Sequence, residues 1–81
     1  MTGGQVVMTT TPQQISPTPY GATALNLRSA TGNSAIQLFV EPAKPATGYL
    51  LAGEARQYTN TSPHLVYAAG TAGNILYWDA V

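Results

Sequence analysis

With 81 residues, the chain has room for one small domain with a modest core. Its apolar fraction of 44% is ordinary, but only 7% of the residues are charged and the formal net charge is zero, whereas an average soluble domain has about 25% charged residues. This composition excludes the clustered Lys and Arg side chains that nucleic-acid binding requires. A surface so poor in charge predicts that much of it is covered by partner molecules.

The usual covalent supports of a small domain are also excluded. The chain has no cysteine and a single histidine, His64, so neither a disulfide nor a thiolate metal site is expected. We therefore expect additional stability to come from association with further copies of the chain. No secretory signal is recognisable, and the longest apolar runs, 49–52 and 65–69, are far shorter than the roughly 18 residues that span a bilayer.

At the start of the chain, residues 1–12 are expected to form an N-terminal arm or edge strand, and residues 13–81 the domain itself. Within the arm, residues 5–10 are β-prone, whereas 1–5 are expected to be flexible. The nearby prolines leave room for only a short strand at 13–16, which is best placed at a sheet edge.

Two alternating segments, 24–28 and 35–40, read as half-buried strands, with a turn at 29–34 between them. They are predicted to form an antiparallel pair. Four apolar side chains are expected to enter one core from this pair: Leu25, Leu27, Ile36 and Leu38.

The remaining strands alternate with turns, and no window shows the period of a helix. A proline-rich segment, 42–48, is expected to be an exposed loop. The strands are expected at 49–51, 54–58, 64–68 and 74–79, the last two forming a hairpin around 70–73. In the last strand, Ile75 and Tyr77 lie on the opposite face from Leu76 and Trp78. The predicted fold is all-β, a small antiparallel β-sandwich or jelly-roll-like barrel of about eight short strands.

Residues able to perform catalysis are few and scattered. A serine with His64 and Asp79 is the one nucleophilic arrangement the composition allows, and the spacing does not predict it. The carboxylates Glu41, Glu54 and Asp79 have simpler roles as solubilising charges. Glycine-rich phosphate loops are absent from the sequence. We expect a protein that is not an enzyme and that binds no cofactor and no metal.

Aromatic side chains are the more plausible binding residues. Tyr67 and Tyr77 are expected to be half-buried in the core, because strands favour aromatic residues. Trp78 is as well suited to an interface as to the core. Tyr20 and Tyr49 adjoin loops that contain proline or glycine, so they fit either role.

Five segments together give the chain a family resemblance. They are Thr11-Pro12-Gln13-Gln14-Ile15, Leu25-Asn26-Leu27-Arg28-Ser29, Ile36-Gln37-Leu38-Phe39-Val40, Gly48-Tyr49-Leu50-Leu51-Ala52-Gly53-Glu54 and Leu65-Val66-Tyr67-Ala68-Ala69-Gly70-Thr71-Ala72-Gly73-Asn74-Ile75. In this order the chain resembles the small β-sandwich decoration (cement) and head-fibre proteins of tailed bacteriophages. Arg28 and Ser29 depart from the polar ending that is usual for the second segment.

The resemblance implies a non-enzymatic virion protein, synthesised in the host cytoplasm and displayed on the outer surface of the mature capsid. It implies an oligomer, most commonly a homotrimer, that binds the major capsid protein and stabilises the shell, with neither nucleic acid nor membrane as a partner. The candidate contacts with the shell or with a neighbouring copy are Val6, Val7, Met8, Tyr20, Tyr49 and Trp78.

Two other functions remain open. The tyrosines and Trp78 also suit a receptor- or glycan-binding module of a head or tail fibre. A small neck or tail adaptor would share the fold and differ mainly in its copy number per virion.

Overall fold

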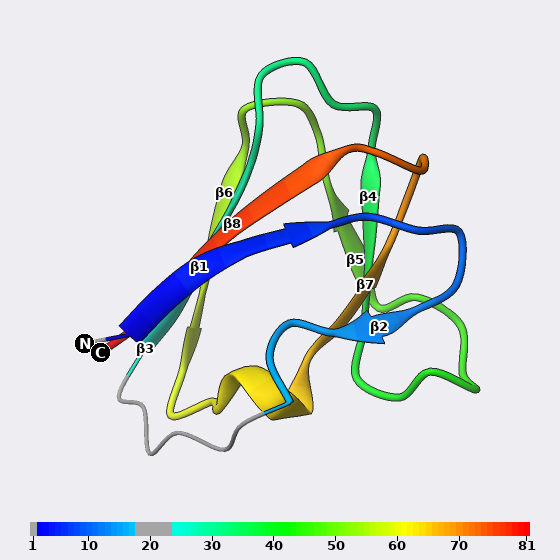
Figure 1. Cartoon of the computed structure of the whole chain (residues 1–81). Helices are drawn as coiled ribbons and strands as arrows, with labels where there is room; N and C mark the ends of the chain where they lie inside the picture. Colours follow the sequence, from blue (N-terminus) through cyan, green and yellow to red (C-terminus); the bar gives the residue numbers. More distant parts are fainter. Residues whose placement is uncertain (1, 18–23) are drawn as a thin grey trace.

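The computed structural model describes residues 2–17 and 24–81 and confirms an all-β fold. The eight strands of the described residues form two four-stranded antiparallel sheets that pack as a small β-sandwich (Figure 1). Sheet A contains, in spatial order, β1 (Thr2–Val7), β8 (Ile75–Ala80), β3 (Ala24–Ser29) and β6 (Ala55–Thr59). Sheet B contains β2 (Gln13–Gln14), β7 (Tyr67–Ala69), β4 (Ile36–Phe39) and β5 (Gly48–Leu50).

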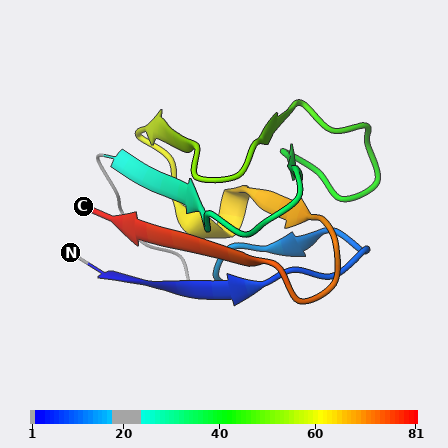
Figure 2. The ribbon, with the colours of Figure 1, turned by 90° about the horizontal axis from the view of Figure 1, so that it is seen from above.

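The two sheets are layered with their edge strands aligned. Figure 2 shows β1 and β2 along one side of the sandwich and β6 and β5 along the other. The first and last strands are neighbours in sheet A, where Thr2 lies in register with Ala80. The two ends of the chain therefore meet at one corner of the molecule (Figure 1).

The core lies between the sheets and is built by the alternation of side chains along each strand. The four predicted core residues are confirmed, since each is at most 1% exposed: Leu25, Leu27, Ile36 and Leu38. The same cluster contains Met8, Ile15, Leu50, Val66, Ala68, Leu76 and Ala80.

The predicted pairing of segments 24–28 and 35–40 is wrong. β3 belongs to sheet A, where it pairs with β6 and β8, whereas β4 belongs to sheet B. The predicted hairpin around 70–73 is wrong for the same reason, because β7 and β8 also lie in different sheets. In both cases the turn carries the chain from one sheet across to the other, so that consecutive strands face each other through the core instead of pairing.

Three local expectations also change. Thr2–Val7 is a paired strand, so residues 2–5 are not a flexible start. The segment expected as a strand at 64–68 begins with a 3₁₀ turn, Pro63–Leu65, because proline at the first position lacks the N–H that a strand needs. Tyr67 is half-buried as expected and Tyr77 is exposed, but both lie on the outer faces of their sheets, B and A, and neither is part of the core cluster. The exposed loop is confirmed, with residues 42–45 all exposed.

Candidate functional site

The predicted contacts in the N-terminal segment have three different environments. Val6 packs against the core from the inner face of β1, and Val7 on the outer face is 54% exposed. Met8, just after the strand, is 1% exposed and belongs to the core, so its side chain is not part of any surface. The accessible features of this segment are therefore the backbone of β1 and the side chain of Val7.

The other predicted contacts lie apart from one another. Tyr49 is 59% exposed on β5, at the opposite side of the sandwich from β1. Trp78 on β8 is half-buried and packs against the core, next to β1. Tyr20 lies outside the described residues. The structure thus brings Trp78 together with β1 but not with Tyr49.

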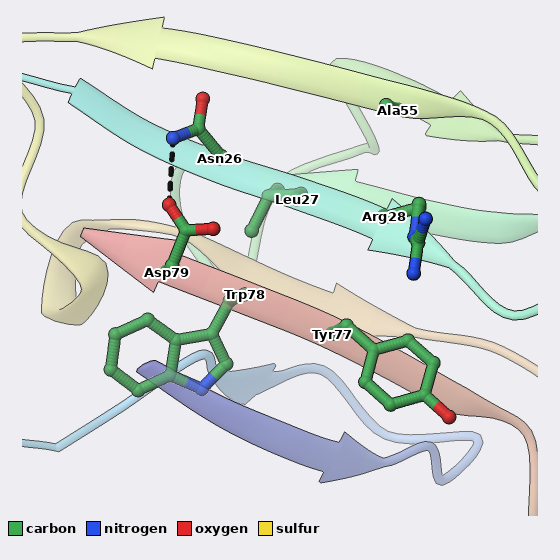
Figure 3. A pocket seen from close by; sticks show the side chains of 7 residues that line it. All are labelled: Asn26, Leu27, Arg28, Ala55, Tyr77, Trp78 and Asp79. Atoms are coloured by element: carbon green, nitrogen blue, oxygen red, sulfur yellow. Dashed lines mark hydrogen bonds between the residues drawn. The ribbon is translucent and has the colours of Figure 1, made fainter. Parts of the chain in front are cut away.

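The indole of Trp78 lies over Gly4. A Cβ at Gly4 would be 3.4 Å from the indole Nε1 and 3.8 Å from Cε2, so the ring occupies the space above this glycine. Figure 3 shows the ring reaching from β8 toward β1. The indole of Trp78 therefore reaches from β8 to the edge strand of sheet A.

In the part of the chain that the structure describes, the strand that pairs with β1 is β8. The amide of Met8 donates to the carbonyl of Asn74 at 2.7 Å, and the carbonyl of Met8 accepts from Gly73. Because antiparallel strands point alternate residues toward their partner, Val6 and Gly4 also point toward β8. Gly3, Gln5 and Val7 therefore direct their N–H and C=O groups away from the sheet.

On each open side of the sandwich, one long side chain forms a hydrogen bond that connects the edge strands of the two sheets. We call these two residues, Gln13 and Arg56, the edge-bridging side chains. On the β1 side, Gln13 Nε2 of β2 donates to the carbonyl oxygen of Val7 at 2.7 Å. On the other side, Arg56 Nη2 of β6 donates to the carbonyl oxygen of Tyr49 at 3.3 Å. Both donors share a strand face with core residues, so these bonds hold the two sheets together at their margins.

The outer face of sheet A carries a row of hydrogen-bonded side chains, two amides and a carboxylate, across three strands. We call it the polar row. Gln57 Nε2 donates to Asn26 Oδ1 at 2.8 Å. Asn26 Nδ2 in turn donates to Asp79 Oδ1 at 2.7 Å (Figure 3). Beside this polar row the Arg28 guanidinium lies 5.9 Å from the ring centroid of Tyr77, a cation–π contact. A shallow depression of about 300 Å³ lies here, and its lining includes Asn26, Arg28, Tyr77 and Asp79.

The polar row was not predicted from the sequence. The alternation of polar residues on the third and eighth strands places Asn26 and Asp79 on outer faces, but only the register of β3 against β8 sets them opposite each other. That register depends on strands more than 50 residues apart pairing directly, as the separation of 53 residues between Asn26 and Asp79 shows. No local signal specifies such a pairing.

The outer face of sheet B is different in character. None of its described strand residues is charged: they are Gln14, Gln37, Phe39, Tyr49, Tyr67 and Ala69. Gln37 and Tyr49 are exposed, Gln14 and Tyr67 are half-buried, and Phe39 and Ala69 are buried. Leu51, directly after β5, adds a further apolar side chain that is 54% exposed. We call this surface the uncharged face.

The residues considered for catalysis have other partners. His64 Nδ1 lies 2.6 Å from Ser62 Oγ in the turn before β7, whereas Asp79 receives a hydrogen bond from Asn26 in sheet A. Glu54 Oε1 accepts from the amide of Leu51, and Glu41 pairs with Lys44 in the exposed loop. Within the part of the chain that the structure describes, no three metal-ligating side chains come together and no helix is long and apolar enough to cross a membrane.

Comparison of the chain with protein families, curated proteins and solved structures gives no match.

Proposed function

We propose that this chain is a non-enzymatic structural protein of a bacteriophage virion, a decoration protein that binds the outer surface of the mature head as an oligomer and stabilises the shell. The observation that carries the proposal is the uncharged face, where none of the described strand residues on the outer face of sheet B carries a charge. It agrees with the expectation from composition that much of the surface is covered.

Five of the six charged residues lie elsewhere on the molecule. Arg28 and Asp79 are on the outer face of sheet A. Arg56 of β6 donates a hydrogen bond to β5 at the edge of the sandwich. Glu41 and Lys44 are in the exposed loop. The sixth, Glu54, lies in the turn between β5 and β6, where it accepts a hydrogen bond from the amide of Leu51. A face that keeps only amide, aromatic and small apolar side chains resembles the core of a protein interface, where charged residues are depleted and aromatic residues enriched.

Tyr49 is the most prominent side chain of this face, with 59% of its surface exposed. Leu51, directly after β5, and the exposed Gln37 of β4 lie near it. In the proposed assembly these side chains contact the major capsid protein. Each copy contributes modestly, and simultaneous engagement of several linked copies raises the total avidity.

Binding to heads tests the proposal directly. Undecorated, expanded heads of the phage that encodes the chain are mixed with purified protein and sedimented, and bound copies are counted by quantitative gel densitometry. The native chain should co-sediment to saturation and raise the temperature at which the heads release their DNA. Gln37→Lys and Tyr49→Lys should weaken binding at least 10-fold, because each places an unpaired charge in the contact.

A matched substitution on the other sheet serves as the control. Thr59→Lys adds the same charge to the exposed outer face of β6 and should bind heads as the native chain does. Absence of binding by the native chain to mature heads would refute the proposal.

The depression on sheet A supports a second candidate, a receptor- or glycan-binding module of a fibre. Tyr77, 39% exposed, offers a ring for stacking, and Asn26 and Asp79 offer hydrogen-bonding groups beside it (Figure 3). Such a combination is typical of sugar recognition. Binding of the purified chain on a glycan array, lost in Tyr77→Ala and retained in Tyr49→Ala, would favour this function over the decoration protein.

A further inference from the structure

We propose that the free edge of β1 pairs with β1 of a second copy of this chain across a two-fold axis, joining the two A sheets into one continuous eight-stranded sheet. The inference specifies the self-contact of the oligomer in the proposed function and does not require the capsid. It rests on the length, charge and hydrogen-bonding state of the four edge strands.

Three of the four edges are poorly suited to adding another strand. β2 and β5 have only two and three residues, too few to template a stable ladder. β6 is longer, but it contains Arg56, and an inward-pointing charge on an edge strand is a known protection against edge-to-edge pairing. A two-fold contact through β6 would also bring two arginines together.

β1 lacks all of these protections. It has six residues, Thr2–Val7, with neither a charge nor a proline. In the described part of the chain its pairing partner is β8, and no strand lies on its other side (Figure 2). Two copies can meet along it without repulsion between like charges.

The hydrogen-bonding groups of this edge select a register. Gly3 and Gln5 point both of their backbone groups outward, whereas the carbonyl of Val7 is already bonded to Gln13. Pairing Gly3 with Gln5 of the second copy, and Gln5 with Gly3, forms four hydrogen bonds and uses only groups that have no hydrogen-bond partner among the described residues. Pairing Gln5 with Gln5 would instead require the Val7 carbonyl, because Gly3 would then face Val7.

The selected register places Gly4 of each copy on the two-fold axis. The indole of Trp78 lies over Gly4 on the inner face of the strand. The two indoles therefore come to lie on either side of the axis and cover each other's exposed surface. Trp78 thus becomes part of the same contact as the backbone of β1.

The symmetry of the contact distinguishes it from the trimer that the family resemblance implies. A cyclic trimer needs two different complementary surfaces on each copy, whereas a two-fold contact needs one self-complementary surface. The β1 edge matches itself, and the other long edge of sheet A is guarded by Arg56. The geometry therefore points to a dimer.

Sedimentation velocity of the chain alone tests this inference, with no heads present. At about 0.5 mM the native chain should sediment as a dimer that dissociates on dilution. Gln5→Lys should be monomeric, because it adds a charge to the edge of each copy. Gln5→Pro should also be monomeric, because it removes an outward N–H and leaves the bonds to β8 intact. Gln37→Lys, the same substitution on the uncharged face, should remain a dimer.

Amide hydrogen exchange adds a readout that folding defects do not imitate. In the native chain the amides of Gly3 and Gln5 should be protected at high concentration and exchange at least 10-fold faster on dilution, while those of Gly4 and Val6 stay protected throughout. Trp78 is the single tryptophan, so its emission should shift to shorter wavelength as the dimer forms.

Several results would overturn the inference: a native chain that is monomeric or trimeric at the highest concentration, or a dimer that survives both substitutions of Gln5. Failure of the proposed function gives a different pattern. A dimer that forms normally but ignores heads would refute the decoration protein and leave the β1 contact standing, whereas a monomer that binds heads would do the reverse.

Discussion

The side-chain amide of Asn33 joins the turn after β3 to the start of β8. Its Nδ2 donates to Ser29 Oγ at 2.8 Å and to the carbonyl of Ile75 at 2.6 Å, and its Oδ1 accepts from the amide of Ile75 at 3.1 Å. Ser29 is 1% exposed, so its hydroxyl depends on partners from within the protein. One polar side chain thus satisfies three groups from two strands of sheet A.

Substitution of Asn33 should therefore destabilise the fold more than its position in a turn suggests. Asn33→Ala is expected to lower the free energy of unfolding by about 1–3 kcal/mol, because it leaves buried polar groups without partners. Asn33→Asp should also destabilise, since a carboxylate cannot donate to the Ile75 carbonyl. Urea denaturation followed by circular dichroism measures both effects.

Gln37→Ala provides the control for this experiment. It removes an exposed amide from β4 and should change stability by less than about 0.5 kcal/mol. Equal stability of the Asn33 and Gln37 variants would show that the turn contributes nothing through its side chain.

Sequence reasoning at this scale succeeds where the signal is local. The alternation in 24–28 identified Leu25 and Leu27 as core residues, and the residues 31–33 were recognisable as a turn. The partners of Asn33 were not predictable, because Ile75 is 42 residues away in sequence. The polar row through Asn26 and Asp79 was not predictable for the same reason.

At the scale of the elements, the two edge-bridging side chains make equivalent hydrogen bonds on opposite sides of the sandwich. Gln13 joins β2 to β1, and Arg56 joins β6 to β5. The position of Arg56 is supported by Gly48, where an added Cβ would lie 2.5 Å from the guanidinium Nη1. Each bond satisfies a carbonyl at a strand edge that would otherwise be left to water.

Removing both edge-bridging side chains should have additive effects on the free energy of unfolding. We expect Gln13→Ala and Arg56→Ala each to cost about 0.5–1.5 kcal/mol of stability, as typical single hydrogen bonds do. The double variant should equal the sum within about 0.5 kcal/mol, because the two sites share no partner. Chemical denaturation of all four proteins gives the coupling, and a large coupling energy would mean that the two margins open together.

The strands were easier to predict than their pairing. Six of the expected segments overlap β3 to β8, since alternation and turn residues mark each strand locally. Pairing failed because the predicted hairpins assumed that neighbours in sequence are neighbours in a sheet. Here only β4 and β5 follow one another within the same sheet, and every other connection between described strands crosses the sandwich.

The molecule as a whole depends little on charge. Six residues of 81 are charged, and the ion pair between Lys44 Nζ and Glu41 Oε2 is long, at 3.7 Å, and exposed. Exposed pairs of this kind contribute little to stability. Burial of apolar side chains between the sheets and the hydrogen bonds of the ladders must account for nearly all of it.

Stability should accordingly be almost independent of ionic strength. Between about 0.05 and 1 M NaCl we expect the melting temperature to change by less than about 2 °C, because there are few charge interactions to screen. Differential scanning calorimetry at a fixed protein concentration measures this change. A melting temperature that falls steeply with salt would contradict the assignment of stability to the core.

The position of β8 in sheet A also affects how the protein is made. β8 lies between β1 and β3, yet it is the last of these strands to leave the ribosome. Until it emerges, β1 has no partner within sheet A and β3 lacks one of its two. Pairing over such long sequence separations is slow, with folding times of about milliseconds to seconds for β-sandwiches. Until β8 has emerged, the nascent chain therefore presents an unpaired β1 and one open edge of β3 to its surroundings, and the emergence of β8 becomes the event that completes sheet A.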